Sequence, residues 1–306
     1  MKRACIFICI SFILSTIAAA QSAQIKYAVI PEAPRPGEPV TIGINGTAGQ
    51  AVLSANGRQL SKAVFFPVFD HDGSPIFMAA VFTVPSTANS GAAVIRVENE
   101  EGVIIEIPMT IADRNFDSET IELNPSLTAI RTEPDPQKTA ESDRLWAILS
   151  KTGNEIYHSG KFIPPVLSNR RTSLFGGRRV YKYSNGKTDT SIHAGVDFGM
   201  STGTRVVACG SGKVALARMR IVTGNSVIIE HAPGIYSLYY HLDKIEVKED
   251  TIINIGTLVG LSGATGLATG PHLHWEIRVS TENTDPDAFT ARPIIDKDLI
   301  LSRINN

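Results

Sequence analysis

Hydrophobic and polar positions partly alternate along the short runs that dominate residues 22–112. The clearest runs are PVTIGI, AAVIRVEN and GVIIEIPMTIA. Turn-forming pairs lie between such runs, among them Asn45-Gly46, Asn56-Gly57 and Asp72-Gly73. Short alternating runs separated by turns at this spacing are typical of β-strands that pack face to face. Residues 22–112 are therefore predicted to form an immunoglobulin-like β-sandwich.

The pattern changes over residues 113–165. The stretch RTEPDPQKTA, with its prolines and scattered charges, is typical of a linker. Leu145, Ile148 and Leu149 then recur at helical spacing, and Gly153 provides a C-terminal stop. This segment is predicted to be a linker with a short helix packed between two domains. Trp146 of that helix is predicted to be a packing residue.

Strand-like runs return over residues 166–292, where glycines break them more often. Neither a sustained helical period nor a repeat of fixed length is visible in this region. A second β-rich domain is therefore predicted, followed by a C-terminal tail at residues 293–306. The whole chain is predicted to be mainly β.

The N-terminus has a different character. Lys2 and Arg3 precede an almost wholly apolar run, Ile6 to Ile17, and three alanines follow it. This order predicts a secretory signal peptide, residues 1–20, cleaved before Gln21. A membrane anchor is the alternative, but the apolar run is shorter than the roughly 20 residues that cross a bilayer.

No later segment is long and apolar enough to cross a membrane. The prediction is therefore an exported protein of the periplasm, the cell envelope or the extracellular space, with no transmembrane segment after cleavage. A formal net charge of -1 and the lack of any basic excess give no indication of a nucleic-acid partner. Signal cleavage would remove Cys5 and Cys9, so Cys209 would have no partner for an internal disulfide. In its apolar surroundings Cys209 is predicted to be a small buried side chain.

Candidate chemistry gathers in the second β-rich region. His193 and Asp197 stand four residues apart in HAGVDFG, and His272 and His274 stand two apart in GPHLHWEI. Side chains two apart on a strand point to the same face, about 6.5–7 Å apart along the backbone. His241 follows the aromatic run YSLYY and is predicted to end a strand. Each pattern alone also fits ordinary surface polarity.

The combination is more specific than its parts. A catalytic zinc ion takes three protein ligands and keeps one position for water. His193, Asp197 and one histidine of the HLH pair provide three such ligands. The other histidine of the pair and His241 fit a role in proton transfer and charge stabilisation, because the pKa of histidine lies near neutrality. Spacing does not decide which member of the pair binds the metal.

HAGVDFG, YYHLDKI and GLSGATGLATGPHLHWEIR resemble the motifs of the lysostaphin/LytM-type zinc metallopeptidases, which cleave peptidoglycan. The resemblance covers about residues 168–290. It implies an antiparallel β-rich peptidase domain with one zinc ion (Zn2+) held by His193, Asp197 and His274. His241 and His272 match the two metal-free catalytic histidines. No member of this set of five is missing.

The resemblance implies an exported zinc metalloendopeptidase that hydrolyses the peptide cross-links of peptidoglycan, whose peptide stems are its partner. The alternative is a non-enzymatic wall-binding or amidase-activating scaffold, the role of relatives that have lost ligands. The sequence neither supports nor excludes contacts between the N-terminal domain and other envelope proteins.

Several further residues are assigned more modest roles. His231 is predicted to be structural, and the FDHDG stretch at 69–73 is predicted to be an exposed hairpin turn. Arg178 and Arg179 fit either contacts to carboxylates of a wall peptide or a solvated turn. Tyr183 does not stand at the spacing expected for an oxyanion-stabilising tyrosine, so that role has no candidate.

Overall fold

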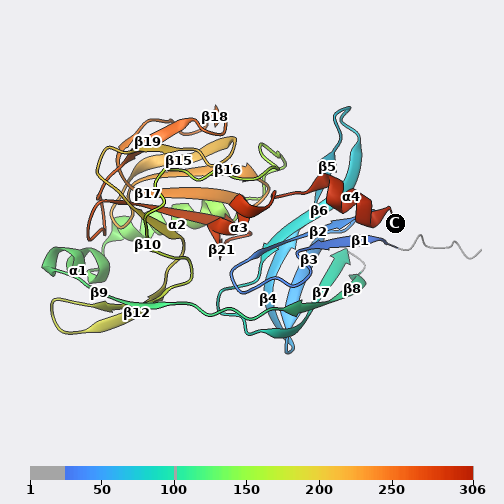
Figure 1. Cartoon of the computed structure of the whole chain (residues 1–306), viewed down its shortest axis with the longest axis horizontal. Coiled ribbons are helices and arrows are strands. Elements are labelled where there is room, and N and C mark those ends of the chain that lie inside the picture. Colours follow the sequence, from blue (N-terminus) through green and yellow to red (C-terminus); the bar gives the residue numbers. More distant parts are fainter. Residues whose placement is uncertain (1–24, 100–101, 306) are drawn as a thin grey trace, which may run out of the picture.

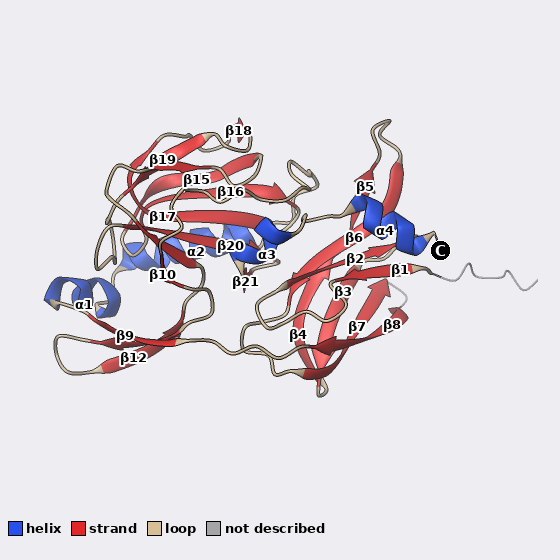
Figure 2. Ribbon diagram, viewed as in Figure 1, coloured by secondary structure: helices blue, strands red, loops and turns tan. Residues whose placement is uncertain are grey.

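The computed structural model describes residues 25–99 and 102–305. The predicted signal peptide, with Cys5 and Cys9, lies outside the described residues. Figure 1 shows two lobes side by side, and Figure 2 shows that strands dominate both. The mainly β prediction is therefore confirmed. Within the described part of the chain, no helix is both long and apolar enough to cross a membrane.

The first lobe is a sandwich of two four-stranded antiparallel sheets. One sheet has the order β1-β2-β6-β5 and the other the order β4-β3-β7-β8. The strands are β1 (Tyr27–Ile30), β2 (Pro39–Ile44), β3 (Gln50–Ala55), β4 (Arg58–Val64), β5 (Phe66–Phe69), β6 (Pro75–Thr83), β7 (Gly91–Asn99) and β8 (Gly102–Ile111).

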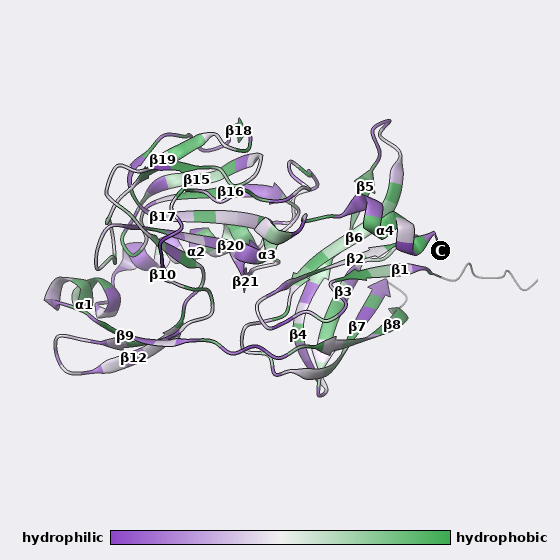
Figure 3. Cartoon of the chain, viewed as in Figure 1, coloured by the Kyte–Doolittle hydropathy of each residue, from purple (hydrophilic) through white to green (hydrophobic). Residues whose placement is uncertain are grey.

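Alternation of side chains builds the core of this sandwich. Val40, Ile42 and Ile44 of β2 belong to the same buried cluster as Leu53 of β3 and Ile95 of β7. Hydrophobic and hydrophilic bands alternate along several of its strands (Figure 3). Successive strand residues point to opposite faces, so one face of each sheet forms this core. The other face of β2 is buried as well, because Ile300 near the C-terminus packs against Gly43.

The segment between the lobes contains more structure than the single helix predicted for it. Strand β9 (Ser118–Glu122) and helices α1 (Pro125–Thr132) and α2 (Pro136–Leu149) lie here. Leu149 of α2 is buried against the outer face of the second lobe's sheet, and Leu145 and Ile148 pack beside it. The prediction for Trp146 is wrong: the residue is 49% exposed. It lies about 100° around the helix from Leu145, outside the face that packs.

The second lobe is built on a ten-stranded sheet whose main path is β10-β13-β20-β17-β16-β15-β18. Its strands are β10 (Arg171–Ser173), β13 (Val196–Gly199), β14 (Arg205–Val207), β15 (Gly212–Arg220), β16 (Gly224–Ala232), β17 (Ile235–Ile245), β18 (Ile252–Ile253), β19 (Leu258–Ser262), β20 (His272–Val279) and β21 (Glu282–Thr284). A three-stranded sheet, β12-β11-β9, adjoins it and contains β11 (Arg178–Lys182) and β12 (Thr188–Ile192).

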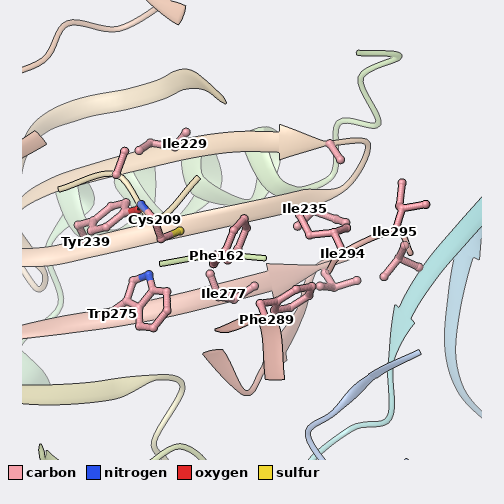
Figure 4. Packing of buried hydrophobic residues seen from close by; sticks show 14 of the residues in the cluster. Phe162, Cys209, Ile229, Ile235, Tyr239, Trp275, Ile277, Phe289, Ile294 and Ile295 are labelled. Atoms are coloured by element: carbon pink, nitrogen blue, oxygen red, sulfur yellow. The ribbon is translucent and has the colours of Figure 1, made fainter. Parts of the chain in front are cut away.

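The chain ends with helices α3 (Pro286–Ala291) and α4 (Lys297–Ile304). Residues 293–306 were predicted to be a tail, but α4 lies against β1 and β2 of the first lobe. Ile294, Ile295 and Ile300 belong to a buried cluster that also includes side chains of both lobes. Figure 4 shows Ile294 and Ile295 where this cluster reaches the sandwich.

Candidate metal centre and active site

Three candidate ligands meet where β13 pairs with β20. In this antiparallel register Asp197 stands opposite His274, and Gly199 stands opposite His272. His193 lies just before β13, where its backbone N–H donates to the carbonyl of Gly177. The alternation of β20 directs Leu273 and Trp275 into the core, where both are fully buried. His272 and His274 therefore share the opposite face, as the sequence predicted.

The donor atoms of these ligands converge. His193 Nε2 lies 3.1 Å from His274 Nδ1. Asp197 Oδ1 lies 2.7 Å from His274 Nδ1 and 3.1 Å from His193 Nε2. Among the described residues this is the group of histidine, cysteine and acidic side chains that could hold a metal ion. All three side chains are buried or nearly so.

The donor set fits zinc. Two imidazoles and one carboxylate are typical zinc ligands, and with bonds of about 2.0–2.2 Å a tetrahedral site spaces its donors roughly 3.3–3.5 Å apart. The spacings here are slightly shorter because hydrogen bonds join the three groups. Three protein donors would leave one position of a tetrahedral ion for water.

The remaining nitrogen of each ligand histidine has its own acceptor. His193 Nδ1 donates to the carbonyl of Leu174 at 2.8 Å. His274 Nε2 donates to Glu276 Oε1 at 2.9 Å, and Glu276 accepts in turn from Arg278. Acceptors of this kind fix the tautomer and orientation of a metal-binding histidine. They leave His193 Nε2 and His274 Nδ1 as the atoms that can bind a cation.

Asp197 is held through its second oxygen. Arg179 Nη2 donates to Asp197 Oδ2 at 2.8 Å, and the Arg179 side chain is only 12% exposed. Of the two alternatives for Arg178 and Arg179, the solvated turn is wrong, because both residues lie within β11. Arg178 instead donates to the carbonyls of Gly176 and Ser86.

His241 occupies a β-bulge. The sequence predicted that it ends a strand, but β17 continues to Ile245. The pairing with β16 shifts register here, and His241 has a φ of 61°, in the left-handed region. A bulge redirects a side chain within a strand and is common beside active sites. The bulge brings the His241 ring to 4.8 Å from the His272 ring, measured between centroids.

His241 and His272 are oriented in the same way. His241 Nδ1 donates to the carbonyl of Thr265, and His272 Nδ1 donates to that of Gly270, both at 2.8 Å. Each ring therefore keeps Nε2 as a proton acceptor when neutral. His272 Nε2 lies 3.9 Å from Asp197 Oδ1, so this nitrogen points toward the metal centre.

Burial and neighbouring charges shift the pKa values in different directions. Burial lowers the pKa of His241 to about 3, so this ring is neutral at physiological pH. Burial also acts to lower the pKa of His274, but Asp197 and Glu276 outweigh it and raise that pKa to about 9. Although burial opposes its ionisation, the neighbouring His274 and His193 hold the pKa of Asp197 well below its usual range. Asp197 is therefore an anion at a place suited to a cation.

Other residues that the sequence singled out lie elsewhere. Tyr183 contacts Arg131 and Asp189, away from the metal centre. His231 is fully buried and contacts Ser237 and the Ser211 carbonyl. The FDHDG stretch forms the exposed turn between β5 and β6.

Glu276 and Tyr240 are among the contributors that sequence reasoning missed. Glu276 follows His274 by two residues, so strand alternation could have placed it on the same face. Tyr240 stacks on the His274 ring at 5.6 Å with an interplanar angle of 4°. It stands opposite His274 in the β17–β20 pairing, which no local pattern reveals.

Residues 191–286 match the model of peptidase family M23. Over 161 residues it is 42% identical to peptidoglycan DD-endopeptidase ShyB of Vibrio cholerae, covering 52% of this chain and 36% of that protein. Over 129 residues it is 36% identical to peptidoglycan DD-endopeptidase ShyA of the same organism, covering 42% of this chain and 29% of that protein. The chain thus aligns with only about a third of the length of these relatives.

A solved structure resembles most of the chain. It is of a Pseudomonas aeruginosa protein assigned to peptidase M23, and the TM-score is 0.59 at 23% identity. The match covers 84% of this chain and 94% of that chain. At this identity the likeness concerns the fold, which extends over both lobes and the segment between them.

Proposed function

We propose that this chain is an exported zinc metalloendopeptidase that hydrolyses peptide cross-links of peptidoglycan. The convergence of His193 Nε2, Asp197 Oδ1 and His274 Nδ1, each within 3.1 Å of the other two, carries the proposal. The peptidase M23 match and the peptidoglycan endopeptidases among the relatives support the substrate class.

The residues divide into two roles. His193, Asp197 and His274 would hold the zinc ion. A bound zinc ion would supply Lewis-acid polarisation of the scissile carbonyl and would lower the pKa of water. His241 and His272 carry the proton chemistry: a neutral Nε2 accepts the proton of the attacking water, and the resulting N–H donates to the developing oxyanion or the leaving amine. Thr265 and Gly270 keep these two rings in the tautomer that this task needs.

The remaining assignments belong to the same proposal. Residues 1–20 are a signal peptide, residues 22–112 and 166–292 are the two domains, and residues 113–165 connect them. Activity takes place in the periplasm or elsewhere in the cell envelope, where peptidoglycan lies. N-terminal sequencing of the protein recovered from its native host tests the cleavage before Gln21, and an intact N-terminus would contradict export by this route.

Substitution of the two kinds of histidine tests the site. The wild-type chain should bind about one equivalent of zinc and digest purified sacculi, and chelation should abolish digestion until zinc is restored. His274→Ala should lose both zinc and activity, because it removes a ligand. His241→Ala should keep zinc and lose most turnover, because it removes proton transfer worth about 100- to 10,000-fold in rate.

Metal analysis and muropeptide release measure both properties. His71→Ala, which changes an exposed histidine in the β5–β6 turn, is the control and should match the wild type. Digestion of sacculi by His274→Ala at the wild-type rate would refute the ligand assignment. A wild-type chain that binds no zinc and releases nothing would instead indicate a non-enzymatic scaffold.

A further inference from the structure

The segment between the lobes contributes a strand to the surroundings of the metal centre. Strand β9 pairs in parallel with β11, and this register sets Glu119 opposite Arg179 and Glu122 opposite Lys182. Residues 191–286, which match the peptidase family, include neither β9 nor β11. The pairing therefore brings a remote part of the chain to a site that the matched region alone does not complete.

Glu119 holds two groups at once through one oxygen. Its Oε1 accepts from Arg179 Nε at 2.6 Å and from Ser173 Oγ at 2.7 Å. Arg179 Nη2 also donates to Ser173 Oγ at 2.9 Å. The three side chains form a closed triangle of hydrogen bonds.

Both partners of Glu119 contact candidate zinc ligands. Arg179 Nη2 donates to Asp197 Oδ2 at 2.8 Å. Ser173 Oγ lies 3.1 Å from His193 Nδ1, the nitrogen that also donates to the Leu174 carbonyl. Glu119 is thus one side chain removed from two of the three ligands.

The charges in this chain of contacts alternate. Arg179 is largely buried and shares its charge between Asp197 and Glu119, whose side chain is 35% exposed. A buried guanidinium beside a metal ligand repels a divalent cation and draws charge from the carboxylate. A carboxylate at Glu119 offsets that charge and holds the planar guanidinium by its Nε edge, so that Nη2 stays aimed at Asp197.

We propose that Glu119 is a positioning residue for the zinc site, acting on Asp197 through Arg179 and on His193 through Ser173. The inference rests on the proposed zinc-dependent function and extends it to the segment between the lobes. Loss of the Glu119 charge removes one of the two carboxylates that offset the charge of Arg179 and loosens the hold on its Nε edge. Zinc binding then weakens, although no ligand has changed.

Glu119→Gln in the full chain tests this role, because glutamine keeps the size and removes the charge. Loss of an outer contact of a metal site costs about 10- to 100-fold in affinity. Glu119→Gln should therefore bind zinc about 10- to 100-fold more weakly in a competition titration with a chromophoric chelator. The visible absorption of the Co(II)-substituted protein should also change, since it reports ligand geometry. Glu119→Asp, which keeps the charge on a shorter side chain, should lie between Glu119→Gln and the wild type.

Glu122→Gln is the matched control. It makes the same change on the same strand, opposite Lys182 of β11, and its ion pair is exposed, with Nζ and Oε1 3.6 Å apart. It should leave the zinc affinity and the Co(II) spectrum unchanged. Thermal melting of the metal-free proteins shows whether a variant folds. If Glu119→Gln does not fold, the zinc affinities of Glu119→Asp and Glu122→Asp are compared instead. Only Glu119→Asp should bind zinc more weakly than the wild type.

The outcomes separate the two proposals. If the wild type binds zinc and Glu119→Gln matches Glu122→Gln in affinity and spectrum, the positioning role is refuted while the proposed function stands. A Glu119→Gln protein that melts earlier but keeps wild-type affinity and spectrum refutes it as well, because its role is then only structural. If the wild type itself binds no zinc, the proposed function falls, and this inference falls with it.

Discussion

At the scale of single residues, Cys209 shows how strongly burial controls reactivity in this fold. Its side chain is fully buried, and its backbone N–H donates to Tyr239 Oη at 2.9 Å. Figure 4 shows it beside Tyr239 and close to Phe162. Burial raises the pKa of the Cys209 thiol to about 12. The thiolate, which is the reactive form, is therefore scarce at ordinary pH.

Cys209 should be inert in the native protein. With a pKa of about 12, only about one thiol in ten thousand is ionised at pH 8. A chain with Cys5 and Cys9 changed to serine should give no colour with a thiol-specific disulfide reagent at pH 8 until guanidinium unfolds it, and then about one equivalent. Labelling of the folded protein within minutes would contradict the burial of this residue.

The sequence predicted those site residues whose arrangement follows from their spacing along one strand. His272 and His274 share a face because strand alternation has period two, and that follows from their spacing. Arg179 and Tyr240 could not be placed in this way. Arg179 contacts Asp197 through an ion pair between side chains of two different sheets, and Tyr240 contacts His274 through the pairing of β17 with β20. No local sequence pattern encodes either contact.

At the scale of elements, the close approach of β13 and β20 brings Asp197 and His274 together. Gly195 permits this approach, since a Cβ at that position would lie 2.2 Å from the carbonyl oxygen of Trp275. The Trp275 side chain is fully buried in the core, so β20 has no room to move away. A side chain at position 195 would therefore separate the two strands.

Gly195→Ala should damage stability and metal binding together. Overpacking of this kind costs about 1–3 kcal/mol, and the separation of Asp197 from His274 should weaken zinc binding. Urea denaturation and zinc titration measure the two effects. Gly46→Ala, where the nearest atom to an added Cβ is a side-chain carbon of Ile25 at 3.7 Å, should change neither. If Gly195→Ala were as stable as the wild type, β20 would be able to move away from β13, contrary to this prediction.

Strands were easier to predict than the segment between the lobes. PVTIGI coincides with β2, because alternation and turns are local signals. Strand β9 carried no such signal: its burial pattern has no buried position, and its parallel pairing with β11 depends on a partner far along the chain. Helix α2 was predicted from Leu145, Ile148 and Leu149, whereas Trp146 was misjudged, because hydrophobicity alone does not fix which side of a short helix packs.

At the scale of the whole molecule, the C-terminal residues connect the lobes. After α3 the chain crosses to the sandwich, where Thr41 Oγ1 donates to the carbonyl of Ile294 at 2.9 Å. Helix α4 then packs on β1 and β2, with Ile300 fully buried against Gly43. Arg303 donates to the carbonyl of Val29 at 3.0 Å. The two lobes therefore share one continuous buried cluster.

This shared core should make the two lobes unfold in one transition. Truncation of Ile300 should separate the unfolding of the sandwich from that of the second lobe. Truncation of a buried isoleucine to alanine costs about 2–5 kcal/mol, and here the cost falls on the sandwich side. Both tryptophans, Trp146 and Trp275, lie outside the sandwich, so fluorescence follows the second lobe while circular dichroism follows both. In Ile300→Ala the dichroism transition in urea should begin at lower denaturant than the fluorescence transition, whereas the wild-type transitions should coincide.

Leu167→Ala removes a fully exposed side chain and should behave as wild type. Coincident transitions with an unchanged midpoint in Ile300→Ala would mean that α4 rests on the sandwich without stabilising it.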